Sequence, residues 1–169
     1  MEVGAGNGLT FPHYPSEVTG VTAVEPEPYL ALRAARAVPQ GRIGIQCIRG
    51  VAEALPLRTA SCDAGVASLV LCSVDNLRSA LCELHRVIRP GGELRFYEHV
   101  LSSDPCLAGW QRRMDFLWSR VNGGCHIVRE TLTAITEAGF AVSECDHFTF
   151  RPNVLSQLAA PHLIGRAGR

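Results

Sequence analysis

The sequence contains no lysine, since all 16 basic residues of the 169-residue chain are arginine. A lysine that forms a Schiff base, or one that binds phosphate in a P-loop, is therefore excluded within this chain. The basic residues are balanced by 16 acidic ones, so no net charge attracts nucleic acid or an anionic membrane surface. No apolar run approaches the roughly 18 residues that a spanning helix needs, and no signal peptide precedes the first motif. We expect a cytoplasmic protein without a membrane span or a nucleic-acid partner.

The sequence also lacks cysteine pairs of the C-x-x-C type. A free thiol inside an apolar stretch behaves as a small hydrophobe. Single cysteines without such pairs therefore predict a reducing compartment and no metal site. The seven cysteines stand singly, mostly inside apolar stretches, at Cys47, Cys62, Cys72, Cys82, Cys106, Cys125 and Cys145.

The most informative segment is the opening one, in which Glu2 leads a Gly-x-Gly-x-Gly run made of Gly4, Gly6 and Gly8. Such glycines at the end of a strand let the backbone turn sharply and leave the strand edge open to a flat ligand. The third glycine comes one residue earlier than in the Gly-x-Gly-x-x-Gly motif of a pyrophosphate cradle, which would need glycine at Leu9. The spacing favours S-adenosylmethionine over a dinucleotide, with a plain structural loop as the alternative.

A carboxylate follows the next apolar run, Val21 to Val24, at Glu25. This position is close to the interval at which a ribose-binding acid is expected after a glycine loop. A carboxylate can accept hydrogen bonds from both ribose hydroxyls. We therefore predict that Glu25 binds a ribose, with a surface glutamate as the alternative.

Strands alternate with helices along the chain, which is typical of a parallel sheet covered on both faces. Asn76 is predicted to cap the second helix, and residues 90–92, Pro-Gly-Gly, to stop it and turn the chain into a strand. Residues 151–160 are expected to form a loop. Because no repeat or linker divides the chain, we predict a single domain over residues 1–169. Strands are expected at 21–24, 47–50, 63–71, 93–98, 140–147 and 162–167, and helices at 28–38, 76–88, 107–121 and 129–138.

These motifs carry a resemblance to a known family. The chain resembles the class I S-adenosylmethionine-dependent methyltransferases, which implies an α/β, Rossmann-like methyltransferase fold with a mostly parallel sheet. Further strings resemble the methyltransferase-like 7 group, whose animal members are thiol S-methyltransferases, and the resemblance covers nearly the whole chain. The superfamily resemblance rests on residues 2–8, Val24-Glu25-Pro26, residues 50–56, Asp63 with residues 69–74, and Arg89-Pro90-Gly91-Gly92; the narrower one rests on residues 69–74, Glu98-His99-Val100, Gly124-Cys125 with Arg129-Glu130-Thr131, and residues 161–165.

The resemblance implies a cofactor site for S-adenosyl-L-methionine. In the family the glycine loop faces the methionine part, an acid after the second strand holds the ribose, and an alanine and an acid after the third strand border the adenine. The end of the fourth strand lines the cavity between cofactor and acceptor. For Glu53 and Cys72, a solvated acid and a core thiol are the alternatives. The implied contacts are Glu2, Gly4, Ala5, Gly6, Gly8, Glu25, Pro26, Ala52, Glu53, Leu71 and Cys72.

The implied reaction is an in-line displacement in which the sulfonium already activates the methyl group, so the protein mainly supplies alignment. A thiol, with a reference pKa of about 8.5, needs only modest stabilisation of its thiolate, whereas a hydroxyl needs a base. His99 is the first candidate catalytic residue, because it stands just past the fifth predicted strand and the carboxyl ends of parallel strands face the ligand crevice. His126, beside Cys125 in the glycine break, is the second. A hydrogen-bonded structural histidine is the alternative for both.

The chain departs from the family at its start. The family has helices and most of the first strand before the glycine motif, whereas Met1 stands immediately in front of it here. We therefore expect an N-terminally truncated domain with its first strand largely missing. The predicted function is methyl transfer to a small-molecule acceptor, of which a thiol, a phenol, a lipid and a quinone-like ring are candidates. The alternatives are a catalytically impaired cofactor-binding module or fragment and a nicotinamide-dependent oxidoreductase, the latter disfavoured by the glycine spacing.

Overall fold

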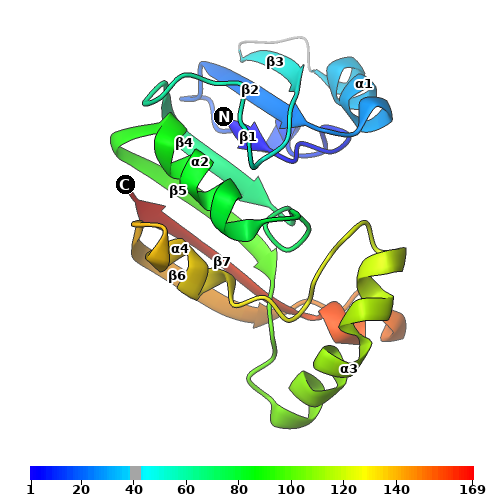
Figure 1. The fold of residues 1–169 in the computed structure, drawn as a ribbon. Coiled ribbons are helices and arrows are strands. Elements are labelled where there is room, and N and C mark those ends of the chain that lie inside the picture. The colour runs from blue at the N-terminus through cyan, green and yellow to red at the C-terminus, as the bar shows by residue number, and fades with distance from the viewer. Residues whose placement is uncertain (39–42) are drawn as a thin grey trace.

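The computed structural model describes residues 1–38 and 43–169, and these form one seven-stranded sheet in the order β3-β2-β1-β4-β5-β7-β6 (Figure 1). The first five strands in this order run parallel, and β7 lies antiparallel to both β5 and β6. The α/β fold predicted from the sequence is therefore confirmed. The strands are β1 (Glu2–Val3), β2 (Gly20–Glu25), β3 (Gly44–Arg49), β4 (Cys62–Ser68), β5 (Ile88–His99), β6 (Ala141–Thr149) and β7 (Pro161–Gly168).

Helices connect these strands. The four predicted α-helices are confirmed to within a few residues, and both tryptophans lie on α3. Among the described residues no helix combines the length and the apolar character that crossing a bilayer requires. The helices are α1 (Pro28–Ala37), α2 (Leu77–Val87), α3 (Pro105–Val121) and α4 (Thr131–Glu137), with short 3-10 turns η1 (Phe11–His13) and η2 (Val154–Ala159).

The sheet has a packed core on each face, as adjacent residues of β2 show. Ala23 packs in one buried cluster with Phe11 and with Ala34 of α1, whereas its neighbour Val24 packs in the main core with the leucines of α2. Successive side chains of a strand point to opposite faces, so α1 and α2 cover opposite faces of the sheet. In Figure 1, α4 lies on the same side as α2, and α3 extends from the end of β5.

The short strand β1 lies in the middle of the sheet. Glu2 and Val3 each pair with β2 on one side and with β4 on the other. The ammonium group of Met1 donates to the carbonyl of Ala64 at 2.8 Å. Because β1 connects to β2 on one side while β4 lies on its other side, the point where the strand order reverses falls between β1 and β4.

Helix α2 begins as the sequence predicts. Asn76 accepts a hydrogen bond from the Ser79 N–H at 3.0 Å and so caps the helix. Leu81 and Leu84 are fully buried on its inner face.

Two predictions about local structure were wrong. Residues 90–92 do not separate α2 from a new strand, because β5 already begins at Ile88 and these residues bulge within it: Ile88 pairs with Cys62, and Glu93 pairs with Ala64. Gly92 fits the bulge because a Cβ there would lie 2.5 Å from the carbonyl of Asp63. The predicted loop at residues 151–160 contains η2, whose capping box at Asn153 and Ser156 is a local hydrogen-bond pattern easily taken for a turn.

Candidate functional site

The candidate site lies where the parallel strands end. In open α/β sheets ligands bind outside the carboxyl ends of the strands, at the point where the strand order reverses. That point lies between β1 and β4. The residues that follow β1, β2, β4 and β5 meet there, and they include most of the predicted site residues.

The glycine loop after β1 turns through three residues with positive φ, Gly4 (+66°), Gly6 (+57°) and Gly8 (+82°). A Cβ at Gly4 would lie 2.3 Å from a methyl carbon of Val70, and one at Gly8 would lie 2.8 Å from the ring of Phe11. These two glycines are therefore required by the packing of the loop itself. At Gly6 a Cβ would meet nothing within 4 Å, so only this glycine faces open space.

Glu25 holds this loop in place from the end of β2. Its carboxylate accepts from the Gly6 N–H at 2.8 Å and from the Glu27 N–H at 3.1 Å, and the residue is 6% exposed. Each carboxylate oxygen has a second lone pair, which leaves acceptor capacity for two hydroxyl groups of a ligand. The open face at Gly6 and the adjacent Glu25 carboxylate thus fit the adenosyl cofactor that the resemblance implies.

Glu2 has a different environment. It is 1% exposed, and its two oxygens accept from the Thr10 hydroxyl at 2.6 Å and from the Tyr14 hydroxyl at 2.9 Å. Burial raises the pKa of Glu2, and these two hydrogen bonds oppose the rise. Glu2 therefore holds residues 10–14 next to β1 through these two hydrogen bonds. A direct contact between Glu2 and a cofactor stays a prediction.

The predicted adenine-binding residues follow β3. Ala52 is 5% exposed and packs in the main core, while Glu53 is half-buried and accepts from the Asn76 N–H at 3.1 Å. Ala5 is also buried, and Pro26 is exposed beside Glu25. Adenine contacts by Ala52 and Glu53, and cofactor contacts by Ala5 and Pro26, stay predictions.

The segment after β4, residues 69–74, is held from two sides. The buried carboxylate of Glu98 accepts from the N–H groups of Val70, Leu71 and Cys72 at 3.1, 2.9 and 3.0 Å. The guanidinium of Arg129 donates to the carbonyls of Leu71 and Val74. Burial raises the pKa of Glu98 well above its ordinary range, and the three N–H donors oppose the rise.

Leu69, which opens this segment, has a positive φ of +55° although it is not glycine. Backbone strain of this kind costs about 1–3 kcal/mol and concentrates at functional sites. Its N–H donates to the carbonyl of Tyr97 at 2.7 Å, which helps to fix the strained residue.

Cys72, His99 and Cys125 come together at this edge of the sheet. The two sulfurs are 3.6 Å apart, and His99 Nδ1 lies 3.6 Å from the Cys72 sulfur and 3.4 Å from the Cys125 sulfur. The hydrogen bond to Cys125, together with burial, raises the pKa of Cys72 to about 12, and the bond between the two thiols lowers the pKa of Cys125.

A cavity of about 450 Å³ adjoins these three side chains, and it lies within the size range of small-molecule sites. The indole N–H of Trp118 is buried without a hydrogen-bond partner among the described residues. The lining consists of Leu69, Cys72, Ser73, His99, Trp118, Asn122, Cys125, Ser156 and Ala159.

His126, the second predicted catalytic histidine, does not line this cavity. Its Nδ1 lies 2.7 Å from a carboxylate oxygen of Asp115, and its side chain is 40% exposed. Its backbone N–H donates to the carbonyl of Cys72 at 2.7 Å, which ties the Cys125 segment to the end of β4. A catalytic role for His126 stays a prediction.

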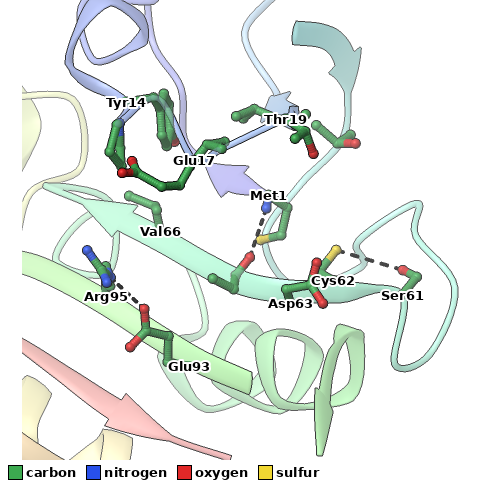
Figure 2. Close-up of a pocket in the computed structure, with 16 residues that line it drawn as sticks. Met1, Tyr14, Glu17, Thr19, Ser61, Cys62, Asp63, Val66, Glu93 and Arg95 are labelled. Carbon is green, nitrogen blue, oxygen red and sulfur yellow. Dashed lines mark hydrogen bonds and ion pairs between the residues drawn. The ribbon is translucent and has the colours of Figure 1, made fainter. Parts of the chain in front are cut away.

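A second cavity of about 450 Å³ lies at the opposite ends of the strands (Figure 2). Met1, Thr19, Cys62 and Asp63 line it, and Figure 2 shows the Met1 ammonium bonded across it to β4. None of the predicted site residues lines this cavity. It faces away from the carboxyl ends of the strands, so we do not assign the reaction to it.

Sequence reasoning missed three residues that shape the site. Leu94, Phe96 and Glu98 occupy alternate positions of β5, and all three are buried. This alternation could have identified Glu98 as an acid that faces the core. Gln111 of α3 is fully buried, but a polar residue in an amphipathic helix carries no such signal. Cys125 follows a glycine break and has no local pattern that would place it beside Cys72.

Comparisons with known proteins agree with this geometry. A family model described as a methyltransferase domain matches residues 1–96. Thiol S-methyltransferase TMT1B of Rattus norvegicus is 34% identical over 173 residues, which cover 99% of this chain and 69% of that protein. Thiol S-methyltransferase TMT1A of Homo sapiens is 33% identical over 174 residues, with the same shares.

Solved structures show the same fold. A SAM-dependent methyltransferase from Methanosarcina mazei superposes with a TM-score of 0.76 at 18% identity, covering 99% of this chain and 90% of that one. A S-adenosylmethionine-dependent methyltransferase from Mesorhizobium loti gives a TM-score of 0.69 at 20% identity, with shares of 99% and 89%.

Proposed function

Because this chain belongs to the methyltransferase-domain family and uses S-adenosylmethionine as its methyl donor, we propose that its acceptor is the thiol of a small molecule. The cofactor supplies a methyl group already activated by the positive charge on its sulfur. Glu25 holds its ribose, the glycine loop faces its methionine part, and the cavity beside Cys72 and His99 receives the acceptor. The likeness to the thiol S-methyltransferases over nearly the whole chain supports this choice of acceptor.

The side chains that line the cavity are the main support for a thiol acceptor. The nine lining residues include two thiols, an imidazole, an indole and three small polar side chains, but no carboxylate and no guanidinium. An ammonium acceptor would need a carboxylate nearby, and a carboxylate acceptor would need a cation. A neutral, polarisable group such as a thiol fits this lining.

The same lining favours a thiol over a hydroxyl. A thiol has a pKa of about 8.5, so part of it is already ionised near neutral pH, whereas an alcohol needs a strong base. Among the described residues of the lining, His99 is the only one with an imidazole, and its Nδ1 lies within hydrogen-bond distance of both cysteine sulfurs. We assign His99 to accepting the acceptor's proton or to orienting its sulfur.

The test is a methyl-transfer assay with small thiols and with the alcohols of matching shape. We expect a thioether and S-adenosylhomocysteine from the thiols and little product from the alcohols. Replacing His99 by glutamine should lower turnover more than the affinity for S-adenosylhomocysteine, which calorimetry measures. Binding of S-adenosylhomocysteine without methyl transfer to any thiol would instead favour a cofactor-binding module.

A further inference from the structure

The side chains of Cys72, His99 and Cys125 form a compact triangle of soft donor atoms. Zinc binds cysteine sulfur at about 2.3 Å and histidine nitrogen at about 2.0–2.1 Å, in tetrahedral geometry. Three such ligands would therefore lie about 3.8 Å (S to S) and about 3.6 Å (S to N) from one another. The observed separations, 3.6 Å between the sulfurs and 3.6 and 3.4 Å from sulfur to nitrogen, match one face of that tetrahedron closely.

The triangle is held by the backbone around it rather than by the three side chains alone. The Cys72 N–H is bonded to Glu98, and the Cys72 carbonyl accepts from His126, the residue after Cys125. His99 ends β5, where it pairs with His162 of β7, and the two rings lie 4.6 Å apart. Preorganised ligands of this kind are what a tight metal site requires.

One side of the triangle is open. All three side chains line the same cavity, although Cys72 is only 1% and Cys125 only 5% exposed. A zinc site with three protein ligands and an open fourth position is the catalytic type, and two cysteines with one histidine are a known donor set for it. Soft thiolate ligands with an imidazole also select zinc over magnesium or calcium.

We propose that Cys72, His99 and Cys125 bind one zinc ion, whose open fourth position in the cavity takes the sulfur of the acceptor thiol as a thiolate. The acceptor half of this inference rests on the proposed function, while the metal half does not. The buried indole N–H of Trp118 lies in the same cavity lining, where it can donate to a thiolate sulfur.

With His99 bound to the ion, zinc replaces His99 in the role of stabilising the thiolate, so the transfer balances without a general base. The acceptor thiol releases its proton to solvent as its sulfur binds the ion. A lone pair of that sulfur forms the new C–S bond to the methyl carbon, while the bond from this carbon to the sulfonium breaks and its electron pair stays on the departing sulfur. The products are a thioether, S-adenosylhomocysteine and one proton.

Cobalt(II) is the probe for the metal site, because thiolate ligands give it a charge-transfer band and tetrahedral geometry gives strong visible bands. The full chain, purified without a histidine tag, is reduced with a phosphine, stripped with chelator and titrated under argon. We expect both bands to saturate at one equivalent and zinc to bleach them. The Cys72→Ser, Cys125→Ser and His99→Gln variants should lose the one-to-one bands, whereas Cys82→Ser, which removes an exposed thiol of α2, should keep them.

All three ligand variants are checked for folding by circular dichroism, and the Cys125→Ser and His99→Gln variants are also checked for retained binding of S-adenosylhomocysteine. Absence of a one-to-one band in the reduced parent chain, or its persistence in all three ligand variants, overturns the metal site. The acceptor position is tested by adding 2-mercaptoethanol or, as the matched control, ethylene glycol to the cobalt form. The thiol alone should shift the charge-transfer band, and no shift would overturn the acceptor role while the metal site stands. Methylation of thiols by metal-free protein would leave the proposed function intact and overturn this inference.

Discussion

Replacing Gln111 of α3 by leucine should loosen the acceptor cavity without disturbing the cofactor loop. Gln111 is fully buried, and its amide nitrogen donates to the carbonyls of Val100, Ile127 and Leu158 at 3.1, 3.3 and 2.9 Å. Its amide oxygen accepts from the Ser102 N–H at 2.7 Å. One side chain therefore joins the segment after β5, the segment after Cys125 and η2, which follow or contain the cavity-lining residues His99, Cys125 and Ala159.

The size of the effect follows from these contacts. Leucine has nearly the same volume but no polar atoms, so four backbone groups lose this partner. A buried polar group left without a partner costs about 1–3 kcal/mol, and the added apolar burial offsets part of the total. We expect the free energy of unfolding to fall by about 2–4 kcal/mol, which a domain of this size can lose and stay folded.

Urea unfolding measures this loss, and steady-state kinetics measure its consequence. The kcat/KM for a thiol should fall at least tenfold, whereas the affinity for S-adenosylhomocysteine should change less than threefold, because the glycine loop makes no contact with Gln111 among the hydrogen bonds described. Arg112→Leu, an exposed neighbour on the same helix, serves as the control and should change neither quantity. A Gln111→Leu variant as stable and as active as the parent would refute this reasoning.

Three further predictions concern the loop after β1. In Glu25→Gln, one of the two backbone N–H groups that donate to the carboxylate would face an N–H of the new amide. The affinity for S-adenosylhomocysteine, measured by calorimetry, should therefore fall by about 1–3 kcal/mol. Unchanged affinity would remove Glu25 from the site. Alanine at Gly4 or at Gly6 is strained by the positive φ of each position. Gly6→Ala has room for its methyl and should weaken cofactor binding with no stability loss beyond this strain, whereas Gly4→Ala also collides with Val70 and should unfold at a clearly lower temperature than Gly6→Ala; equal melting temperatures of the two variants would contradict this contrast. Glu2→Gln keeps both hydroxyl partners, because a hydroxyl can also accept, and removes a buried charge. Burial raises the pKa of Glu2. The stability of the parent relative to this variant should therefore decline as the pH rises from about 4 through that raised pKa. A parent that gains stability over this pH window would contradict the prediction.

Much of the fold could be predicted because the signals are local. The strand before Glu25, the Asn76 cap and the helix at 76–88 were each predicted from residues close in sequence, and all three are confirmed. Residues 90–92 misled the prediction because a Pro-Gly-Gly string stops a helix and also permits a bulge. The choice between these outcomes depends on pairing with β4, which is far away in the sequence.

The candidate site was only partly visible in the sequence. The glycine loop and Glu25 form a local motif, whereas the Cys72, His99 and Cys125 triangle joins residues 26 to 53 positions apart. Single cysteines in apolar stretches indicate core thiols, so nothing local predicted a shared cluster. Glu2 was predicted to meet the cofactor because it leads the motif, yet its visible partners are Thr10 and Tyr14. The single domain over residues 1–169 stays a prediction.

The position of the donor sulfur relative to Cys72 and His99 decides whether this cavity receives the acceptor. A crystal structure with bound S-adenosylhomocysteine measures that position directly. We predict the ribose hydroxyls on Glu25, the homocysteine against Gly6, and the sulfur facing the cavity beside Cys72. A cofactor bound with its ribose away from Glu25, or with its sulfur open to a different surface, would contradict this prediction.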